Sequence, residues 1–306
     1  MRITFCCTDT KPEPWLQGLR DALPKADISL WHSGDPPADY AVVWAPPQAL
    51  FDQQPKLKAA LNIGAGVDAL LALQVPATTK LVRLDDAGMS VQMAEYVCHA
   101  LIRHTREFDV FESNALASTW TRRKPLARAD FPVGILGLGV LGARVAQAVA
   151  QFEFPVLGWS RSPKQIAGVQ CFSGAQELAP FLAGTRVLVN LLPLTPETEN
   201  ILNQHTLSQL KRGAYLINVA RGRHLVEEDL LALLDSGQMA GAMLDVFRTE
   251  PLPEDHPFWT HPRITVTPHT SARTLRSESI AQIVGKIQAL ERGEPVAGVV
   301  DLARGY

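Results

Sequence analysis

The segment VGILGLGVLG at residues 133–142 constrains the fold of this chain more than any other segment. A short apolar run, predicted to be a strand, leads directly into the pattern G-x-G-x-x-G. The first glycine permits a tight turn, the second lets a pyrophosphate approach the backbone, and the third lets helix and strand pack closely. The helix expected to start near residue 141 offers unpaired N–H groups to phosphates. We therefore predict a dinucleotide site, in preference to an ordinary turn, at Gly137, Gly139, Val140, Leu141 and Gly142.

The end of the next predicted strand, 156–159, indicates which dinucleotide binds. An NAD site usually has an acidic residue about twenty positions past the glycines, where it binds the ribose 2′-hydroxyl. This chain has Ser160, Arg161 and Ser162 there instead. The serine hydroxyls can donate hydrogen bonds, and the guanidinium can pair with a 2′-phosphate. We predict NADPH rather than NADH; the alternative is a solvated strand end.

The composition excludes several classes of protein. The chain has 306 residues, enough for about two domains. Its net charge of -2 provides no basic field to attract nucleic acid. We find no apolar segment long enough for a signal peptide or a membrane span. The 4 cysteines form no C-x-x-C pair, so we expect reduced thiols in a cytoplasmic protein.

Alternating strand and helix patterns predict an α/β protein with parallel sheets. The predicted strands span residues 2–7, 28–31, 40–44, 58–63, 80–84, 133–136, 156–159, 186–192, 214–219, 242–246 and 264–267. The predicted helices include one long helix at about 90–118, which can carry the chain between domains, and a last helix at about 271–291.

Two loops in the first ninety residues admit two interpretations each. Residues 64–66, Gly-Ala-Gly, follow a strand, and the N–H groups of Ala65 and Gly66 could hold a small carboxylate. Taken alone, this loop is better explained as a plain turn. Trp44 also ends a strand, and its indole could form the wall of a pocket, although alone it is better explained as a core residue.

Three chemically active side chains follow predicted strand ends in the second half of the chain: Arg221, Glu250 and His269. Ligands of an open parallel sheet bind at the carboxyl ends of its strands, so we expect these groups to gather beside the nicotinamide. The arginine can hold a substrate carboxylate and polarise its ketone. The histidine can protonate the oxygen, and the glutamate can orient the imidazole and favour its charged form.

Each of these three residues also has an ordinary structural explanation. An arginine in a strand-end loop is often an ion-pair residue, a lone histidine after proline is often structural, and a glutamate before proline is often solvated. Their joint placement after a nucleotide loop favours the catalytic interpretation. No H-x-x-x-H or Cys/His spacing supports a metal site.

The ordered motifs resemble those of the D-isomer-specific 2-hydroxyacid dehydrogenases along nearly the whole chain. The matching segments are GAGVD at 64–68, the glycine loop, LLPLTPET at 191–198, NVARG at 218–222, LDVFRTEPLP at 244–253 and VTPHTSA at 266–272. In that family the arginine of N-x-x-R-G, the glutamate before proline and the histidine after proline are catalytic. The resemblance therefore implies that Arg221, Glu250 and His269 are the catalytic residues.

The resemblance also implies an architecture and ligand contacts. It implies two Rossmann-like or flavodoxin-like domains, with a cofactor domain at 93–274 inserted into a substrate domain at 1–92 and 275–306. The substrate contacts are Trp44, Ala65 and Gly66, besides Arg221 and His269. Asp245 is expected to meet the nicotinamide carboxamide, and the remaining contacts expected in the cofactor pocket are Leu192, Pro193, Val219 and Ala220. A homodimer formed around the cofactor domain is the family norm.

Within the family, the segments around Trp44, 89–96 and 159–162 look most like the glyoxylate/hydroxypyruvate reductase A group. The expected activity is NADPH-dependent reduction of a small 2-oxo acid: glyoxylate to glycolate, or hydroxypyruvate to D-glycerate. One alternative is a reductase of a bulkier phenyl- or branched-chain 2-oxo acid. Another is a non-catalytic module that senses NAD(P)H, which the complete catalytic set disfavours.

Overall fold

The computed structural model describes residues 1–8 and 10–302. The chain forms two compact units, one of Met1–Met89 with Arg273–Tyr306 and the other of Ser90–Ala272. The sequence places the two boundaries after residues 92 and 274. No helix among the described residues is long and apolar enough to cross a membrane.

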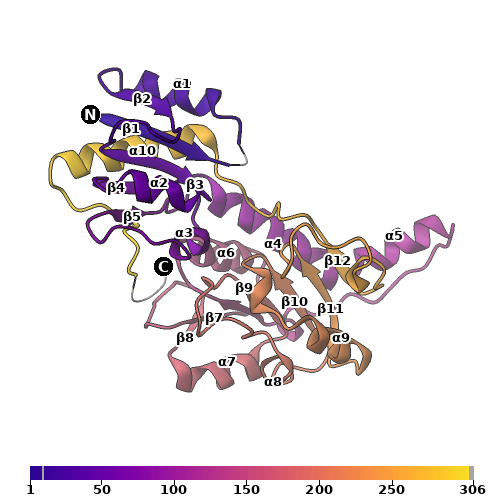
Figure 1. The fold of residues 1–306 in the computed structure, drawn as a ribbon. Helices are drawn as coiled ribbons and strands as arrows, with labels where there is room; N and C mark the ends of the chain where they lie inside the picture. Colours follow the sequence, from indigo (N-terminus) through magenta and orange to yellow (C-terminus); the bar gives the residue numbers. More distant parts are fainter. Residues whose placement is uncertain (9, 303–306) are drawn as a thin grey trace. The chain divides into compact units, whose positions relative to one another are not determined.

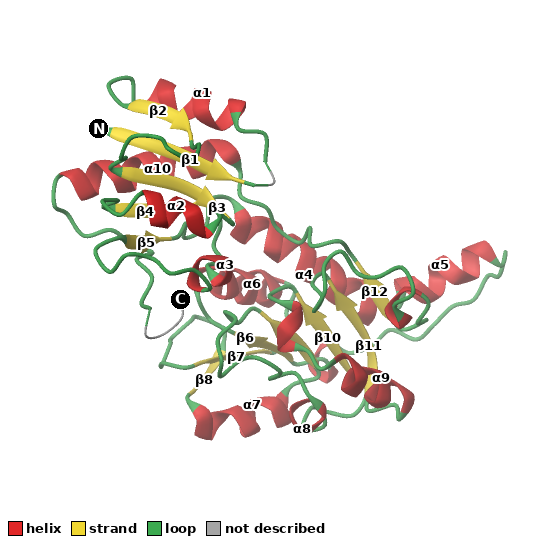
Figure 2. Ribbon diagram, in the orientation of Figure 1, coloured by secondary structure: helices red, strands yellow, loops and turns green. Residues whose placement is uncertain are grey.

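The first unit is a five-stranded parallel sheet with helices on both faces (Figures 1 and 2). The strand order β2-β1-β3-β4-β5 is that of the flavodoxin-like doubly wound fold. Helices α1 and α10 cover one face, and α2 and α3 cover the other. The elements are β1 (Arg2–Cys7), α1 (Glu13–Ala22), β2 (Asp27–Leu30), β3 (Tyr40–Trp44), α2 (Gln48–Gln53), β4 (Ala59–Asn62), α3 (Asp68–Leu71), β5 (Lys80–Val82) and α10 (Arg276–Glu291).

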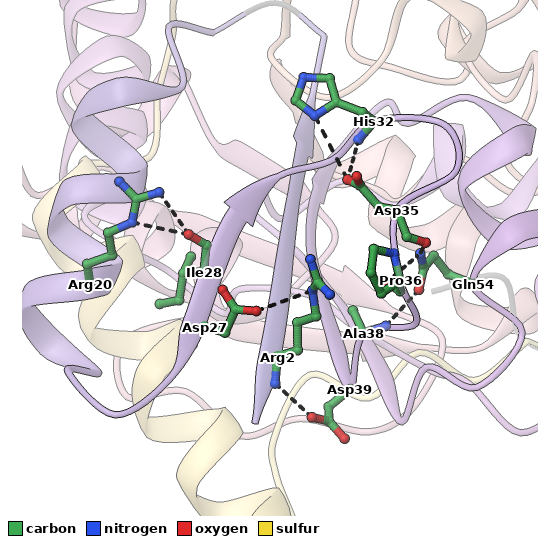
Figure 3. Close-up of polar contacts among 10 residues, drawn as sticks. All are labelled: Arg2, Arg20, Asp27, Ile28, His32, Asp35, Pro36, Ala38, Asp39 and Gln54. Atoms are coloured by element: carbon green, nitrogen blue, oxygen red, sulfur yellow. Dashed lines mark hydrogen bonds and ion pairs between the residues drawn. The ribbon is translucent and has the colours of Figure 1, made fainter.

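The central strands of this sheet are apolar without alternation because helices bury both faces. Strand β3, YAVVW, is buried up to its last residue, and all of β4 is buried. Side chains hold helix α1 and the segment before β3 in place, as Figure 3 shows. The Arg20 guanidinium donates two hydrogen bonds to the Ile28 carbonyl, and the buried Gln54 amide accepts from Ala38 N–H at 2.8 Å.

The second unit is a seven-stranded parallel sheet of order β12-β11-β10-β9-β6-β7-β8. The order reverses between β6 and β9, and such a switch point is where doubly wound sheets bind ligands. Helices α4 and α6 pack on one face, and α7, α8 and α9 pack on the other. The strands are β6 (Val133–Leu136), β7 (Val156–Ser160), β8 (Gln170–Ser173), β9 (Val187–Asn190), β10 (Ala214–Asn218), β11 (Met239–Leu244) and β12 (Ile264–Val266). The helices are α4 (Met89–Thr105), α5 (Phe108–Leu116), α6 (Val140–Gln151), α7 (Leu178–Gly184), α8 (Gln204–Leu207) and α9 (Glu227–Asp235).

Two expected helices differ from the observed ones, and one observed strand was not expected. The single helix predicted at 90–118 is two helices, α4 and α5, because Glu107 has a left-handed backbone (φ 53) that interrupts the helix. The last helix begins at Arg276 rather than near residue 271, since the preceding segment is bonded elsewhere, as described below. Strand β8 was not predicted, because its side chains are only partly buried and its sequence, QCFS, has no apolar run.

His104, near the end of α4, packs against two aromatic rings in the second unit. Its ring stacks on Tyr215 with centroids 4.0 Å apart and meets Phe131 edge-on. The pKa of His104 is lowered from 6.5 to about 4, chiefly by burial. The charge of Arg186 also lowers this pKa, whereas the charges of Asp109 and Glu107 oppose the shift. The folded chain therefore holds this ring neutral at a pH where the unfolded chain protonates it.

We expect the free energy of unfolding to fall as the pH drops through 6.5 toward 4, because the unfolded state then binds one more proton. At pH 5 His104 lowers the free energy of unfolding by an amount on the order of 1–2 kcal/mol. Urea titrations at pH 7.5 and pH 5 measure it. His104→Phe, which keeps the stacking, should lose less stability between the two pH values than the wild type. An equal loss in both proteins would contradict this prediction, and His205→Phe on the exposed face of α8 is the control.

Candidate active site

Glu250 and His269 form a direct pair in the second unit. Nδ1 of His269 lies 2.8 Å from Oε2 of Glu250, and Oε1 of Glu250 accepts a hydrogen bond from Phe247 N–H at 3.0 Å. Burial by itself raises the pKa of Glu250, but the hydrogen bonds of His269 and Phe247 and the charges of His269 and Arg221 lower it below its ordinary value. The carboxylate thus stays ionised and holds Nδ1, which leaves Nε2 for a substrate.

A close approach of two backbones brings the segment of Arg221 toward this pair. Arg221 follows β10 and precedes the 3₁₀ turn Gly222–His224. A Cβ on Gly222 would lie 1.8 Å from the carbonyl carbon of Phe247, so only glycine fits there. This contact places the arginine beside the segment that leads to Glu250, where its charge acts on the carboxylate. The structure therefore brings the three predicted catalytic residues together.

Asp245 holds the segment that presents His269. Its side chain is fully buried and accepts hydrogen bonds from the Thr267 hydroxyl at 2.6 Å and from the N–H groups of Thr270 and Ser271. The Asp245 carbonyl also accepts from His269 N–H at 2.8 Å, which supports the left-handed backbone of the histidine (φ 50). The resemblance implied a contact with the carboxamide, which stays a prediction.

This segment has further partners that the sequence does not predict. The Tyr96 hydroxyl lies 2.5 Å from the hydroxyl of Thr267, so α4 is tied to the segment as well. The signal in the sequence was an acidic residue directly after an apolar strand, followed about twenty residues later by two hydroxyl residues around the histidine. That spacing alone does not indicate which acceptor the hydroxyls bind.

The glycine loop fits a dinucleotide. Gly137 has φ +100, and a Cβ on Gly142 would lie 1.8 Å from the Gly137 carbonyl oxygen, so both positions require glycine. A Cβ on Gly139, in contrast, would meet no atom within 4 Å, which leaves open space in front of the loop. Helix α6 begins at Val140 and has no side-chain cap. Its first N–H groups are therefore available to a pyrophosphate.

The residues expected around the rest of the cofactor occupy the neighbouring strand ends. Ser160 is buried, and its hydroxyl donates to the Ser162 carbonyl at 2.8 Å, while Arg161 and Ser162 are exposed. No acidic residue stands at the end of β7. After β9 and β10 the candidates are Leu192 and Pro193, and the buried pair Val219 and Ala220.

The expected substrate residues of the first unit form one small cluster. A Cβ on Gly64 would lie 2.4 Å from the Trp44 ring, so the indole covers this glycine. The buried Asn62 amide donates to the carbonyls of Gly64 and Gly66. Within the described part of the chain, no hydrogen bond uses the N–H groups of Ala65 or Gly66. Both donors are thus available to an anion.

Comparisons with known proteins show which family the chain resembles. The sequence model of "D-isomer specific 2-hydroxyacid dehydrogenase, NAD binding domain" matches residues 98–271. The chain is 48% identical to a glyoxylate/hydroxypyruvate reductase A from Yersinia enterocolitica and 50% identical to one from Serratia proteamaculans, with 100% of both sequences covered in each comparison.

Two solved structures are also similar over the whole chain. A D-isomer specific 2-hydroxyacid dehydrogenase from Xanthobacter autotrophicus, in complex with NADPH, is 41% identical with a TM-score of 0.94 and covers 100% of this chain and 99% of its own. An NADPH-dependent glyoxylate/hydroxypyruvate reductase from Sinorhizobium meliloti, in complex with NADP and sulfate, is 36% identical with a TM-score of 0.92 and the same coverage. By sequence and structure, this chain belongs to the D-isomer specific 2-hydroxyacid dehydrogenase family.

Proposed function

We propose that the chain reduces glyoxylate to glycolate, or hydroxypyruvate to D-glycerate, with NADPH. The observation that carries the proposal is the Glu250–His269 pair at 2.8 Å with the charge of Arg221 beside it. The relatives at 48% and 50% identity, which bear the name of this activity, support the choice of substrate.

Each step at the substrate has a residue suited to it. When bound, NADPH supplies the hydride. The Arg221 guanidinium binds the substrate carboxylate and polarises the neighbouring carbonyl group. Nε2 of His269 donates a proton to the carbonyl oxygen, while Glu250 holds Nδ1 and stabilises the charged ring.

Steady-state rates with a panel of 2-oxo acids, each with NADPH and NADH, test this proposal. We expect the highest kcat/KM with glyoxylate or hydroxypyruvate and NADPH. A preference for phenylpyruvate or a branched-chain 2-oxo acid would favour the reductase of bulkier substrates. Tight NADPH binding without turnover of any 2-oxo acid would favour the sensing module.

Arg161 carries the predicted preference for NADPH. Its exposed side chain follows β7, where an arginine can pair with the 2′-phosphate that NADH lacks. We expect Arg161→Ala to raise the KM for NADPH by about tenfold, as for the loss of one charge-assisted hydrogen bond, and to leave the KM for NADH unchanged. Arg144→Ala on α6 is the control. An unchanged ratio of the two KM values would remove Arg161 from the 2′-phosphate site.

We further propose a cytoplasmic homodimer. Helix α5 has no buried residue, and the following segment, 117–130, is exposed throughout, with Trp120 and Leu116 both 91% exposed. Exposed apolar groups of this size are typical of an interface. All four cysteines are free, which fits a reducing compartment. Sedimentation velocity should give twice the chain mass of 33.4 kDa, and a monomer mass would contradict the dimer.

A further inference from the structure

Three fully buried polar side chains lie together behind the predicted cofactor and substrate residues. Asn190 ends β9, Asn218 ends β10, and His224 ends the 3₁₀ turn after Arg221; each has an exposed fraction of 0%. The Asn190 amide nitrogen lies 3.0 Å from Oδ1 of Asn218 and 2.9 Å from Nδ1 of His224. Buried polar groups are costly unless every donor and acceptor is paired. The pairing in this cluster therefore constrains which nitrogen of His224 carries the proton.

The hydrogen bonds determine which tautomer His224 adopts. The Asn190 amide nitrogen can only donate, and it lies 2.9 Å from Nδ1 of His224, so Nδ1 must accept. Nε2 of the ring lies 3.2 Å from the Pro193 carbonyl, which can only accept, so Nε2 must carry the proton. The ring is therefore the neutral Nε2–H tautomer, and a second proton on Nδ1 would face a donor.

The same cluster holds the backbone of both loops around it. Oδ1 of Asn190 accepts from Leu192 N–H, and Oδ1 of Asn218 accepts from Ala220 N–H, both at 3.3 Å. Nδ2 of Asn218 donates to the Arg221 carbonyl at 3.1 Å. Every backbone segment bound by the cluster thus carries a residue assigned above to the cofactor or to catalysis.

We propose that His224 is a positioning residue, which as the Nε2–H tautomer holds the Pro193 loop in the conformation that accepts the nicotinamide. The inference rests on the proposed function. His224 does not touch the reacting atoms; it acts through Pro193.

Two variants separate the two ring nitrogens. In His224→Asn the side-chain oxygen takes the place of Nδ1, so the bond to Asn190 remains and the donor to Pro193 is lost. In His224→Gln the longer amide takes the place of Nε2, so the donor to Pro193 remains and the acceptor for Asn190 is lost. Each variant removes one hydrogen bond, and a purely structural role predicts equal effects on both. His205→Asn, in which the exposed histidine of α8 changes in the same way, is the control.

The experiment measures NADPH binding by fluorescence titration, and amide hydrogen exchange of the full chain without ligand. We expect His224→Asn to raise the Kd for NADPH by about tenfold and to speed exchange over residues 190–195, while His224→Gln stays near the wild type in both. Equal changes in the two variants, or a lower thermal midpoint with unchanged Kd and exchange, would overturn the proposal. If the wild-type chain binds no NADPH, the proposed function fails, whereas the exchange data still decide whether His224 holds the Pro193 loop.

Discussion

Replacement of His269 by alanine is expected to lower kcat by about 10²–10⁴-fold, the usual contribution of a positioned general acid. The imidazole has Nδ1 held by Glu250 at 2.8 Å, so Nε2 is the ring nitrogen left to act on a substrate. Removal of the ring eliminates the proton donor and leaves the glycine loop untouched. The Kd for NADPH should therefore remain close to that of the wild type.

Single-turnover rates and NADPH titrations of the same preparation measure both quantities. Glu250→Gln is the informative companion, because it keeps the shape of the side chain and removes the charge that stabilises the protonated ring. It should lower kcat by a smaller factor than His269→Ala. His205→Ala serves as the exposed control. If His269→Ala weakens NADPH binding by the same factor as it lowers kcat, the histidine is not the proton donor.

Replacement of Arg221 by glutamine is expected to lower kcat/KM for the 2-oxo acid by about 10²–10³-fold, the range found when a donor to a developing oxyanion is removed. The guanidinium is assigned both to the substrate carboxylate and to the reacting carbonyl, so both KM and kcat should change. Arg221→Lys keeps the charge but lacks the planar fork, so it should recover only part of the loss.

Arg223→Gln is the matched control for this prediction. Arg223 lies two residues further along the same turn, and its guanidinium donates to Glu199 at 2.8 Å. Its removal changes the charge of the segment equally but leaves the substrate groups in place. Equal losses in Arg221→Gln and Arg223→Gln would mean that net charge, rather than a specific contact, explains the effect.

Much of the site follows from local patterns in the sequence. The run VGILGLGVLG predicts a strand, a turn and a helix, and the structure has β6, the turn and α6 at these residues. Arg221, Glu250 and His269 each follow a strand that can be recognised from its apolar residues. Because parallel strands end at one edge of a sheet, such positions suffice to group the three residues.

Local patterns failed where a single backbone angle or a single distant partner decides the outcome. Nothing in the helical periodicity of residues 90–118 indicates that Glu107 adopts a left-handed backbone. The buried role of His224 was equally hidden, because its partners Asn190 and Pro193 lie more than thirty residues away.

Local patterns in the chain therefore specify the type of fold, the glycine loop and the three chemical groups at the strand ends. The tertiary structure alone decided that Asp245 binds the segment around His269, that Gly222 packs against Phe247, and that Asn190, Asn218 and His224 satisfy one another. The difference arises from the distance along the chain over which each effect acts. Periodicity and turn chemistry act over a few neighbouring residues, whereas the pairing of buried polar groups depends on which strands become neighbours in the sheet.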